Sequence, residues 1–135
     1  MADKLYKSPL DRALKGDARV DSAVIYFQKE KYADAIRMLR SAGGALSIDG
    51  QELLAHAHYK SRQFPEAAAA FETIAQERIR PFSERSEWFH CLSLLAQLPA
   101  PAKKKDLDAL LTKMAADSDH AYYRQAVELK QDLEQ

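Results

Sequence analysis

The chain has 135 residues, which is enough for one domain with a hydrophobic core and too few for two. Its 20 basic side chains balance its 20 acidic ones, and this balance argues against nucleic-acid binding, which depends on neutralising phosphates. The single cysteine, Cys91, excludes an internal disulfide. No apolar stretch approaches the roughly 18 residues of a membrane span, and the first residues lack the apolar core of a signal peptide. The sequence therefore predicts a soluble chain that does not itself insert into a membrane.

The first part of the chain carries little helical periodicity. Pro9 and Gly16 favour an extended lead-in over residues 1–16, with room for one short helical turn. Asp17 can then cap a helix over residues 18–29. The apolar residues of this helix recur with the i, i+3, i+4, i+7 spacing of an amphipathic helix: Val20, Ala23, Val24 and Phe27.

Three more helices follow with short connections. A helix over residues 32–42 ends at Gly43 and Gly44, since glycine readily adopts the left-handed conformation that terminates helices. Asp49 and Glu52 have the spacing of a capping box and predict a helix over residues 50–61. Pro65 suits the first turn of a helix over residues 65–78, which Pro81 ends.

The last third of the chain repeats this plan with longer turns. Ser83 can cap a helix whose apolar face carries Trp88, Cys91, Leu92 and Leu95, and the segment Leu98-Pro99-Ala100-Pro101 breaks that helix. Leu107, Leu111 and Met114 mark the next helix. A final helix over residues 119–134 has one apolar and one charged face. No segment shows sustained strand-like alternation, so the predicted fold class is all-α.

An internal repeat ties these helices together. The segment Tyr32-Ala33-Asp34-Ala35-Ile36-Arg37-Met38-Leu39 is echoed by Phe64-Pro65-Glu66-Ala67-Ala68-Ala69-Ala70-Phe71. In both, an aromatic residue precedes an alanine by three positions and a large apolar residue follows four positions later. This pattern is typical of a helix-turn-helix repeat of about 34 residues. One such unit cannot bury its own apolar face, so it stacks on its neighbours.

On these residues the chain resembles a tetratricopeptide repeat protein. The resemblance covers residues 17–134, with Trp88 at the position of the tryptophan in the first helix of the repeat and Leu107 replacing its small alanine. It implies a right-handed superhelix of about three antiparallel hairpins, over residues 17–48, 49–82 and 83–117. A C-terminal capping helix over residues 118–135 completes the domain 17–135.

A narrower resemblance concerns the end of the chain. The run Glu87-Trp88-Phe89, together with the segment from Asp117 to Ala126, is similar to the ends of bacterial membrane-anchored repeat proteins. It implies that this chain is the soluble part of a longer protein, with residues 1–16 following an anchor.

The family resemblance implies a protein–protein interaction module that binds a partner peptide or helix in the concave groove of the repeats. By alignment, the following residues line this groove: Val20, Val24, Phe27, Gln28, Glu52, His56, Tyr59, Lys60, Phe89 and Ser93. An aromatic and aliphatic strip with a few polar groups suits an apolar peptide or helix.

Two alternatives stay open for this strip. The N-terminal segment or the final helix can fold over it, because small arrays shield their ends. The strip can also be the interface of a homo-oligomer within a larger membrane-anchored protein. Sequence alone does not decide between these occupants and a separate partner.

The sequence predicts neither catalysis nor a metal site nor a cofactor. His56 and His58 are two positions apart, so on a helix they point in opposing directions. Glu87 and His90 form a single Glu-x-x-His motif, whereas a di-iron bundle requires two. Cys91 lies on an apolar helix face and is expected to pack as a small hydrophobe. Phosphate-binding loops and nucleophile elbows are absent from the sequence.

Overall fold

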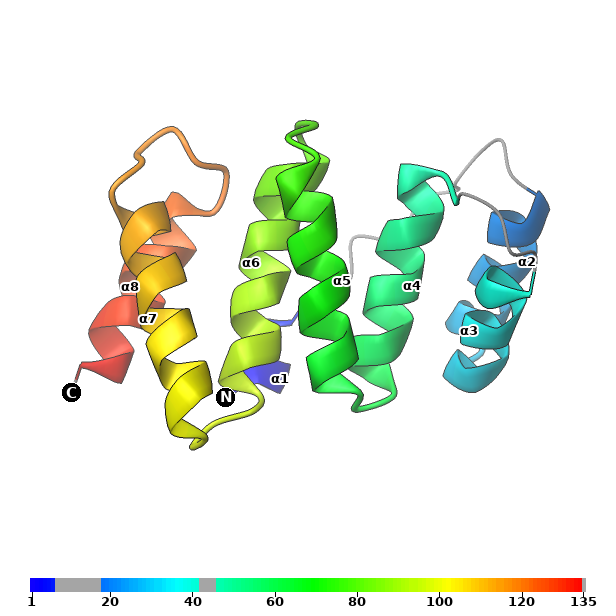
Figure 1. Ribbon diagram of the computed structural model, residues 1–135, viewed down its shortest axis with the longest axis horizontal. Coiled ribbons are helices and arrows are strands. Elements are labelled where there is room, and N and C mark those ends of the chain that lie inside the picture. The colour runs from blue at the N-terminus through cyan, green and yellow to red at the C-terminus, as the bar shows by residue number, and fades with distance from the viewer. Residues whose placement is uncertain (7–17, 42–45, 135) are drawn as a thin grey trace.

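The computed structural model describes residues 1–6, 18–41 and 46–134, and these residues form helices and turns without any strand (Figure 1). The predicted all-α fold class is confirmed for this part of the chain. The helices are α1 (Ala2–Leu5), α2 (Ala18–Gln28), α3 (Tyr32–Arg40), α4 (Ile48–Lys60), α5 (Phe64–Gln76), α6 (Phe82–Leu95), α7 (Pro101–Ala115) and α8 (Tyr123–Leu133).

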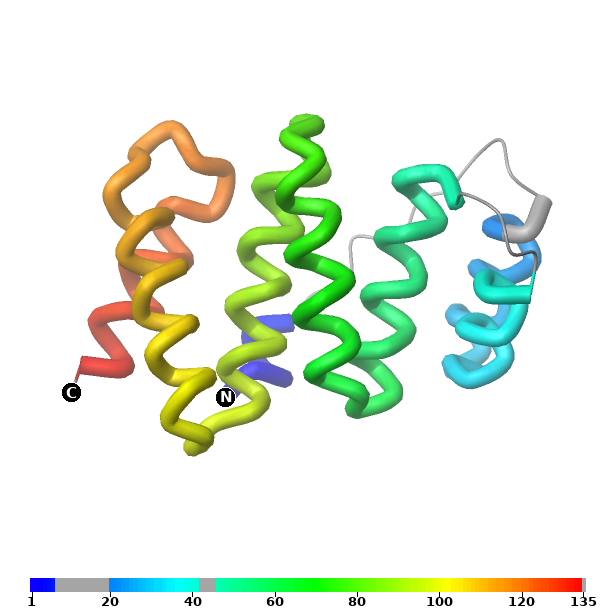
Figure 2. The backbone as a smooth tube through the Cα atoms, viewed as in Figure 1, coloured from blue at the N-terminus to red at the C-terminus, as the bar shows by residue number. Residues whose placement is uncertain are grey.

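From α2 onwards, each helix packs against the helix that follows it in the sequence. The helices stand in a row, with α2 and α3 at one end and α7 and α8 at the other (Figures 1 and 2). Helix α1 departs from this order, because it contacts α6 and lies far from α2, the next helix along the chain. The chain therefore begins in the middle of the row.

The buried side chains form two hydrophobic clusters. The larger cluster joins α4, α5, α6, α7 and α8, and it includes Ala2 from α1, with Leu5 and Tyr6 packed against it. The smaller cluster joins α2, α3 and α4. Helix α4 contributes to both clusters, so it links the first hairpin to the rest of the row.

The sequence repeat is a structural repeat as well. The turn between α2 and α3 places Glu30 at φ 61°, and the turn between α4 and α5 places Arg62, the equivalent residue, at φ 65°. The two residues make equivalent backbone hydrogen bonds. The amide of Glu30 donates to the carbonyl of Phe27 at 3.0 Å, and the amide of Arg62 donates to the carbonyl of Tyr59 at 3.0 Å. The two turns thus reverse the chain in the same way.

In each of the two hairpins, one aromatic ring of the first helix packs against one aromatic ring of the second helix. Phe27 meets Tyr32 edge to face, with 5.2 Å between the ring centroids and 68° between the ring planes. Tyr59 meets Phe64 in the same manner at 5.1 Å and 72°. The two hairpins share the same spacing between these aromatic residues, and this spacing therefore has a packing role.

Two predicted helix starts are wrong in detail. Ser47, not Asp49, caps α4, since its side chain accepts a hydrogen bond from the amide of Gly50 at 3.1 Å. Helix α6 begins at Phe82, so Ser83 lies inside its first turn and is buried. Pro65 does lie in the first turn of α5, and α6 ends before Pro99 as expected. The predicted stops at Gly43 and Gly44 and the cap at Asp17 lie outside the described residues.

Within residues 1–6, 18–41 and 46–134, no helix combines the length and the apolar character that crossing a bilayer requires.

The left-handed backbone of Glu30 provides a test of the repeated turn. This conformation costs an L-residue about 1–2 kcal/mol, and glycine adopts it without that cost. We expect Glu30→Gly to raise the free energy of unfolding by about 0.5–1 kcal/mol, because glycine's greater freedom in the unfolded chain offsets part of the gain. Urea denaturation measures the change. Glu30→Ala is the matched control, since it removes the same charge and keeps the Cβ, and equal stability of the two variants would contradict the assignment.

Candidate functional site

One face of α4 and one face of α6 form a continuous aromatic surface. His56 and Tyr59 lie one turn apart on α4, and Phe89 lies opposite them on α6. The His56 and Phe89 ring centroids are 4.6 Å apart at an interplanar angle of 77°. All three side chains are buried. We refer to His56, Tyr59 and Phe89 as the aromatic strip.

The first residues of the chain lie on the aromatic strip. The Tyr6 ring stacks on the Tyr59 ring, with 4.5 Å between centroids and 8° between planes. It also meets the Phe89 ring at 5.4 Å. The Tyr6 hydroxyl oxygen is 2.6 Å from Nδ1 of His56, and the two groups share a hydrogen bond. Residues 1–6 therefore occupy this surface as a short peptide would.

Charged residues flank the segment. Nζ of Lys60 lies 5.3 Å from the centroid of the Tyr6 ring, within the range of a cation–π interaction. Nη1 of Arg62 is 3.0 Å from Oδ2 of Asp3. Because the Arg62 and Asp3 side chains are 68% and 63% exposed, this ion pair adds little stability. The ring contacts and the Tyr6 hydrogen bond hold the segment more firmly.

A buried ion pair lies one turn before His56 on α4. Glu52 and Arg85 form two hydrogen bonds, from Nε to Oε2 at 2.6 Å and from Nη2 to Oε1 at 3.0 Å. Burial disfavours the charged form of Arg85, but the hydrogen bond and the charge of Glu52 outweigh it and raise the Arg85 pKa. A bidentate pair of this kind fixes the relative position of two helices, because loss of either partner leaves a buried charge unpaired. It thereby sets how α4 and α6 present the aromatic strip.

The strip is electrically neutral near pH 7. Burial, and then the positive charge of Arg85, lower the His56 pKa to about 3. Burial, and then the negative charge of Asp3, raise the Tyr59 pKa to about 12. Nε2 of His56 and the hydroxyl of Tyr59 are buried without a hydrogen-bond partner in the described part of the chain. Neutral rings suit an aromatic ligand side chain.

The structure divides the predicted groove residues into two sets. Glu52, His56, Tyr59, Lys60, Phe89 and Ser93 lie on α4 and α6, where His56, Tyr59, Lys60 and Phe89 are brought together beside residues 1–6. Val20, Val24, Phe27 and Gln28 lie on α2. Val20 is buried in the smaller cluster, Val24 and Phe27 pack against that cluster, and Gln28 is exposed.

Burial differs from what an open groove implies. Glu52, His56, Tyr59, Phe89 and Ser93 are all buried. Ser93 donates its hydroxyl hydrogen to the carbonyl of Phe89 on the preceding turn at 2.9 Å. Its hydroxyl group therefore has a hydrogen-bond partner within α6. Of the alternatives that the sequence left open, the N-terminal segment lies on the strip. The binding role of the predicted groove residues stays a prediction.

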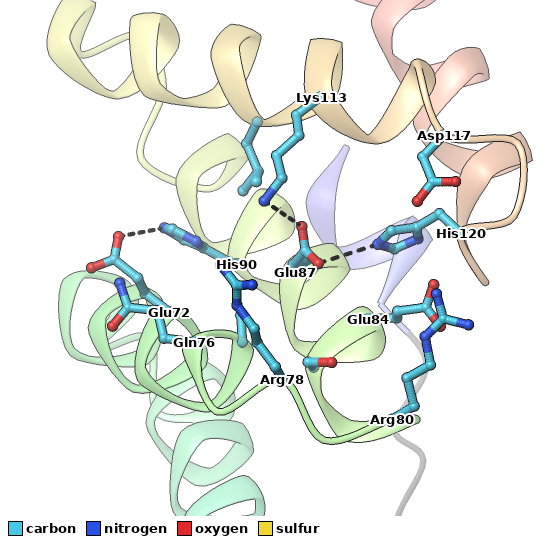
Figure 3. Close-up of a pocket in the computed structure, with 13 residues that line it drawn as sticks. Glu72, Gln76, Arg78, Arg80, Glu84, Glu87, His90, Lys113, Asp117 and His120 are labelled. Atoms are coloured by element: carbon cyan, nitrogen blue, oxygen red, sulfur yellow. Dashed lines mark ion pairs between the residues drawn. The ribbon is translucent and has the colours of Figure 1, made fainter.

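Apart from the aromatic strip, a polar cavity of about 520 Å³ lies among α5, α6, α7 and the turn before α8. Figure 3 shows its charged side chains facing one another. Oε2 of Glu72 is 4.0 Å from Nε2 of His90. Glu87 faces His120 at 3.5 Å and Lys113 at 3.6 Å. Glu87 and Lys113 thus face each other with opposite charges across this cavity.

The Glu-x-x-His motif does not act as one unit. Glu87 pairs with His120 and Lys113, whereas His90 faces Glu72 on α5. Burial is the largest influence on His90 and lowers its pKa. Over residues 1–6, 18–41 and 46–134, no three His, Cys, Asp or Glu side chains converge as a metal site requires.

The remaining candidate residues have packing roles. Cys91 is fully buried, its Sγ lies 3.6 Å from Sδ of Met114, and burial raises its thiol pKa. This confirms the prediction that Cys91 packs as a small hydrophobe. His58 points away from His56, since its Nδ1 is 2.6 Å from Oε1 of Gln63.

Sequence reasoning missed Tyr6, Asp3 and Arg85. A weak signal was present for Tyr6 and for Arg85. Ala2, Leu5 and Tyr6 have the i, i+3, i+4 spacing of one apolar helical turn. A glutamate on an otherwise apolar helix face, as Glu52 is, requires a cation on a neighbouring helix.

No family model, curated protein or solved structure matches this chain.

The low His56 pKa predicts how stability depends on pH. Below the pKa of about 6.5 of an exposed histidine, the unfolded chain takes up a proton at this position, whereas the folded chain, with a His56 pKa of about 3, does not. The stability due to neutral His56 is therefore complete above pH 6.5 and is lost as pH falls towards 3.

Urea denaturation at pH 7 and pH 5 measures this effect. When the pH is lowered from 7 to 5, we expect the free energy of unfolding to fall by about 2 kcal/mol less in His56→Gln than in the wild type. Gln is suitable because it keeps a group that can hydrogen-bond to Tyr6. Identical losses in the two proteins would show that His56 is not held neutral.

Proposed function

We propose that this chain is a tetratricopeptide-like repeat array of about three hairpins with a capping helix, and that it binds a partner peptide without catalysing a reaction. Three features support this proposal. The α2–α3 and α4–α5 hairpins share the same turn and the same packing of aromatic rings. Consecutive helices stack in one row. The helices that correspond to the first helix of a repeat, α4 and α6, carry the aromatic strip.

One observation carries the proposal: a short segment of polypeptide already lies on the strip. Residues 1–6 bring a helical turn, an aromatic ring, a hydroxyl group and a carboxylate to α4, to the turn before α5 and to α6. Each contact is one that a segment from another protein can make, because none requires that the segment belong to this chain. Binding a helical turn in a groove between helices is a common mode of peptide recognition.

Photo-crosslinking from Lys60 tests this function. Lys60 is exposed and its amine lies over the Tyr6 ring, so a photoreactive amino acid at this position reaches a bound partner without disturbing the core. We expect irradiation in lysate of the source organism to attach a discrete partner at position 60. A photoreactive group at Lys104, which is exposed on α7, is the matched control and should not attach that partner.

Two outcomes would contradict the proposal. The same proteins attached from both positions would mean that the contact is not specific to the strip. Attachment of this chain alone, together with a sedimentation coefficient that rises with concentration, would favour the alternative function of homo-oligomerisation.

A further inference from the structure

The segment fills its site incompletely. A cavity of about 440 Å³ adjoins Ala2, and its walls include the apolar side chains of Phe64, Leu95, Leu98 and Leu133. A second cavity of about 350 Å³ adjoins Leu5 and lies against Trp88, Phe89 and Tyr122. Both cavities are open to solvent beside the segment. A segment with larger apolar side chains would gain contacts that residues 1–6 lack.

The contacts of residues 1–6 also indicate which features a better ligand keeps. Tyrosine is favoured over phenylalanine at the position of Tyr6, because without the hydroxyl Nδ1 of His56 would lose its hydrogen bond in a buried setting. An acidic residue three positions earlier meets Arg62, as Asp3 does. That ion pair is exposed, so it contributes direction and register more than affinity.

At the position before the acidic residue, the site has space for a larger side chain. Ala2 is itself buried and borders the larger cavity. A leucine or isoleucine in its place would enter an apolar space walled by α5, α6, the turn after α6, and α8. The site therefore has a defined order of preferences: a large aliphatic residue, an acidic residue, two further positions and a tyrosine.

From these contacts we propose that the partner segment carries the pattern aliphatic–Asp-x-x-Tyr. Residues 1–6 match this pattern only in part, and the partner segment displaces them from the strip. The inference rests on the proposed function and adds the chemistry of the ligand. A tethered segment competes at an effective concentration of millimolar order. Weak contacts are then enough to cover the strip when no partner is present, and the unfilled cavities keep the segment replaceable.

Synthetic peptides test the pattern on the full chain. The probe is a peptide with the sequence of residues 1–6, carrying a fluorophore on an added C-terminal lysine, and fluorescence anisotropy measures its binding. We expect the Tyr6→Ala chain to bind this peptide at least tenfold more tightly than the wild type, because its own segment competes poorly. Tyr6→Phe is a second, milder chain variant, and circular dichroism checks that both variants keep their helices.

Changes in the peptide test each preference separately. Ala2→Leu in the peptide should strengthen binding to the Tyr6→Ala chain by roughly three- to tenfold, since the larger side chain enters the cavity. Tyr6→Phe in the peptide should weaken binding by about tenfold through the lost hydrogen bond. Equal binding of all three peptides would overturn the proposed pattern.

A charge exchange locates the peptide on the structure. In the Tyr6→Ala background, Arg62→Glu should weaken binding of the peptide roughly three-fold, and Asp3→Lys in the peptide should restore it. Arg78→Glu is the matched control, because Arg78 is also exposed and also has a positive φ, of 55°, but lies at the polar cavity. An equal loss with Arg78→Glu would mean that the peptide binds through net charge.

The remaining outcomes separate this inference from the proposed function. If no peptide binds either chain while position 60 still crosslinks a discrete partner, the groove function stands and the aliphatic–Asp-x-x-Tyr pattern is wrong. If wild-type chains instead exchange their N-terminal segments and form dimers in sedimentation experiments, the occupant is a second copy and the proposed partner is wrong.

Discussion

The helical row depends on how closely consecutive helices approach, and small side chains set that approach. Ala23, Ala35, Ala55 and Ala67 are each fully buried, one on each of the four helices from α2 to α5. A larger side chain at these positions would force the helices apart, because protein interiors have no spare volume. Close packing in turn aligns α4 with α6. The Glu52–Arg85 pair then fixes their relative position, and His56, Tyr59 and Phe89 meet as one surface.

That surface requires a cover. Three neutral rings beside one another would otherwise leave apolar area in water, and aromatic contacts add about 0.5–1.5 kcal/mol beyond the area that they bury. Residues 1–6 supply the cover with a single aromatic residue, Tyr6, and leave cavities beside Ala2 and Leu5. A cover that fits poorly is one that a better ligand can replace. The binding function that we propose is thus linked to the open cavities beside the segment.

Helix positions were largely predictable, because the apolar periodicity and the Pro65 and Pro99–Pro101 breaks act within one element. The cap of α4 was not, since Ser47 and Asp49 are both good caps and only the backbone decides between them. The members of the aromatic strip followed from alignment with the repeat family, which gave His56, Tyr59 and Phe89 among the predicted groove residues. Its occupant did not, because Tyr6 meets His56 and Tyr59 across some fifty positions of sequence, and one helical turn carries too short a pattern to reveal a distant partner.

The most direct test of this account is whether Tyr6 lies on the strip in solution. Nuclear Overhauser spectroscopy on the full chain, with selectively labelled tyrosine and phenylalanine rings, measures contacts between ring protons. The stacking of Tyr6 on Tyr59 and its contact with Phe89 should give cross-peaks between these rings, together with ring-current shifts of the Tyr6 protons. Tyr6 signals at the positions of an unfolded tyrosine, without cross-peaks to either ring, would contradict the account.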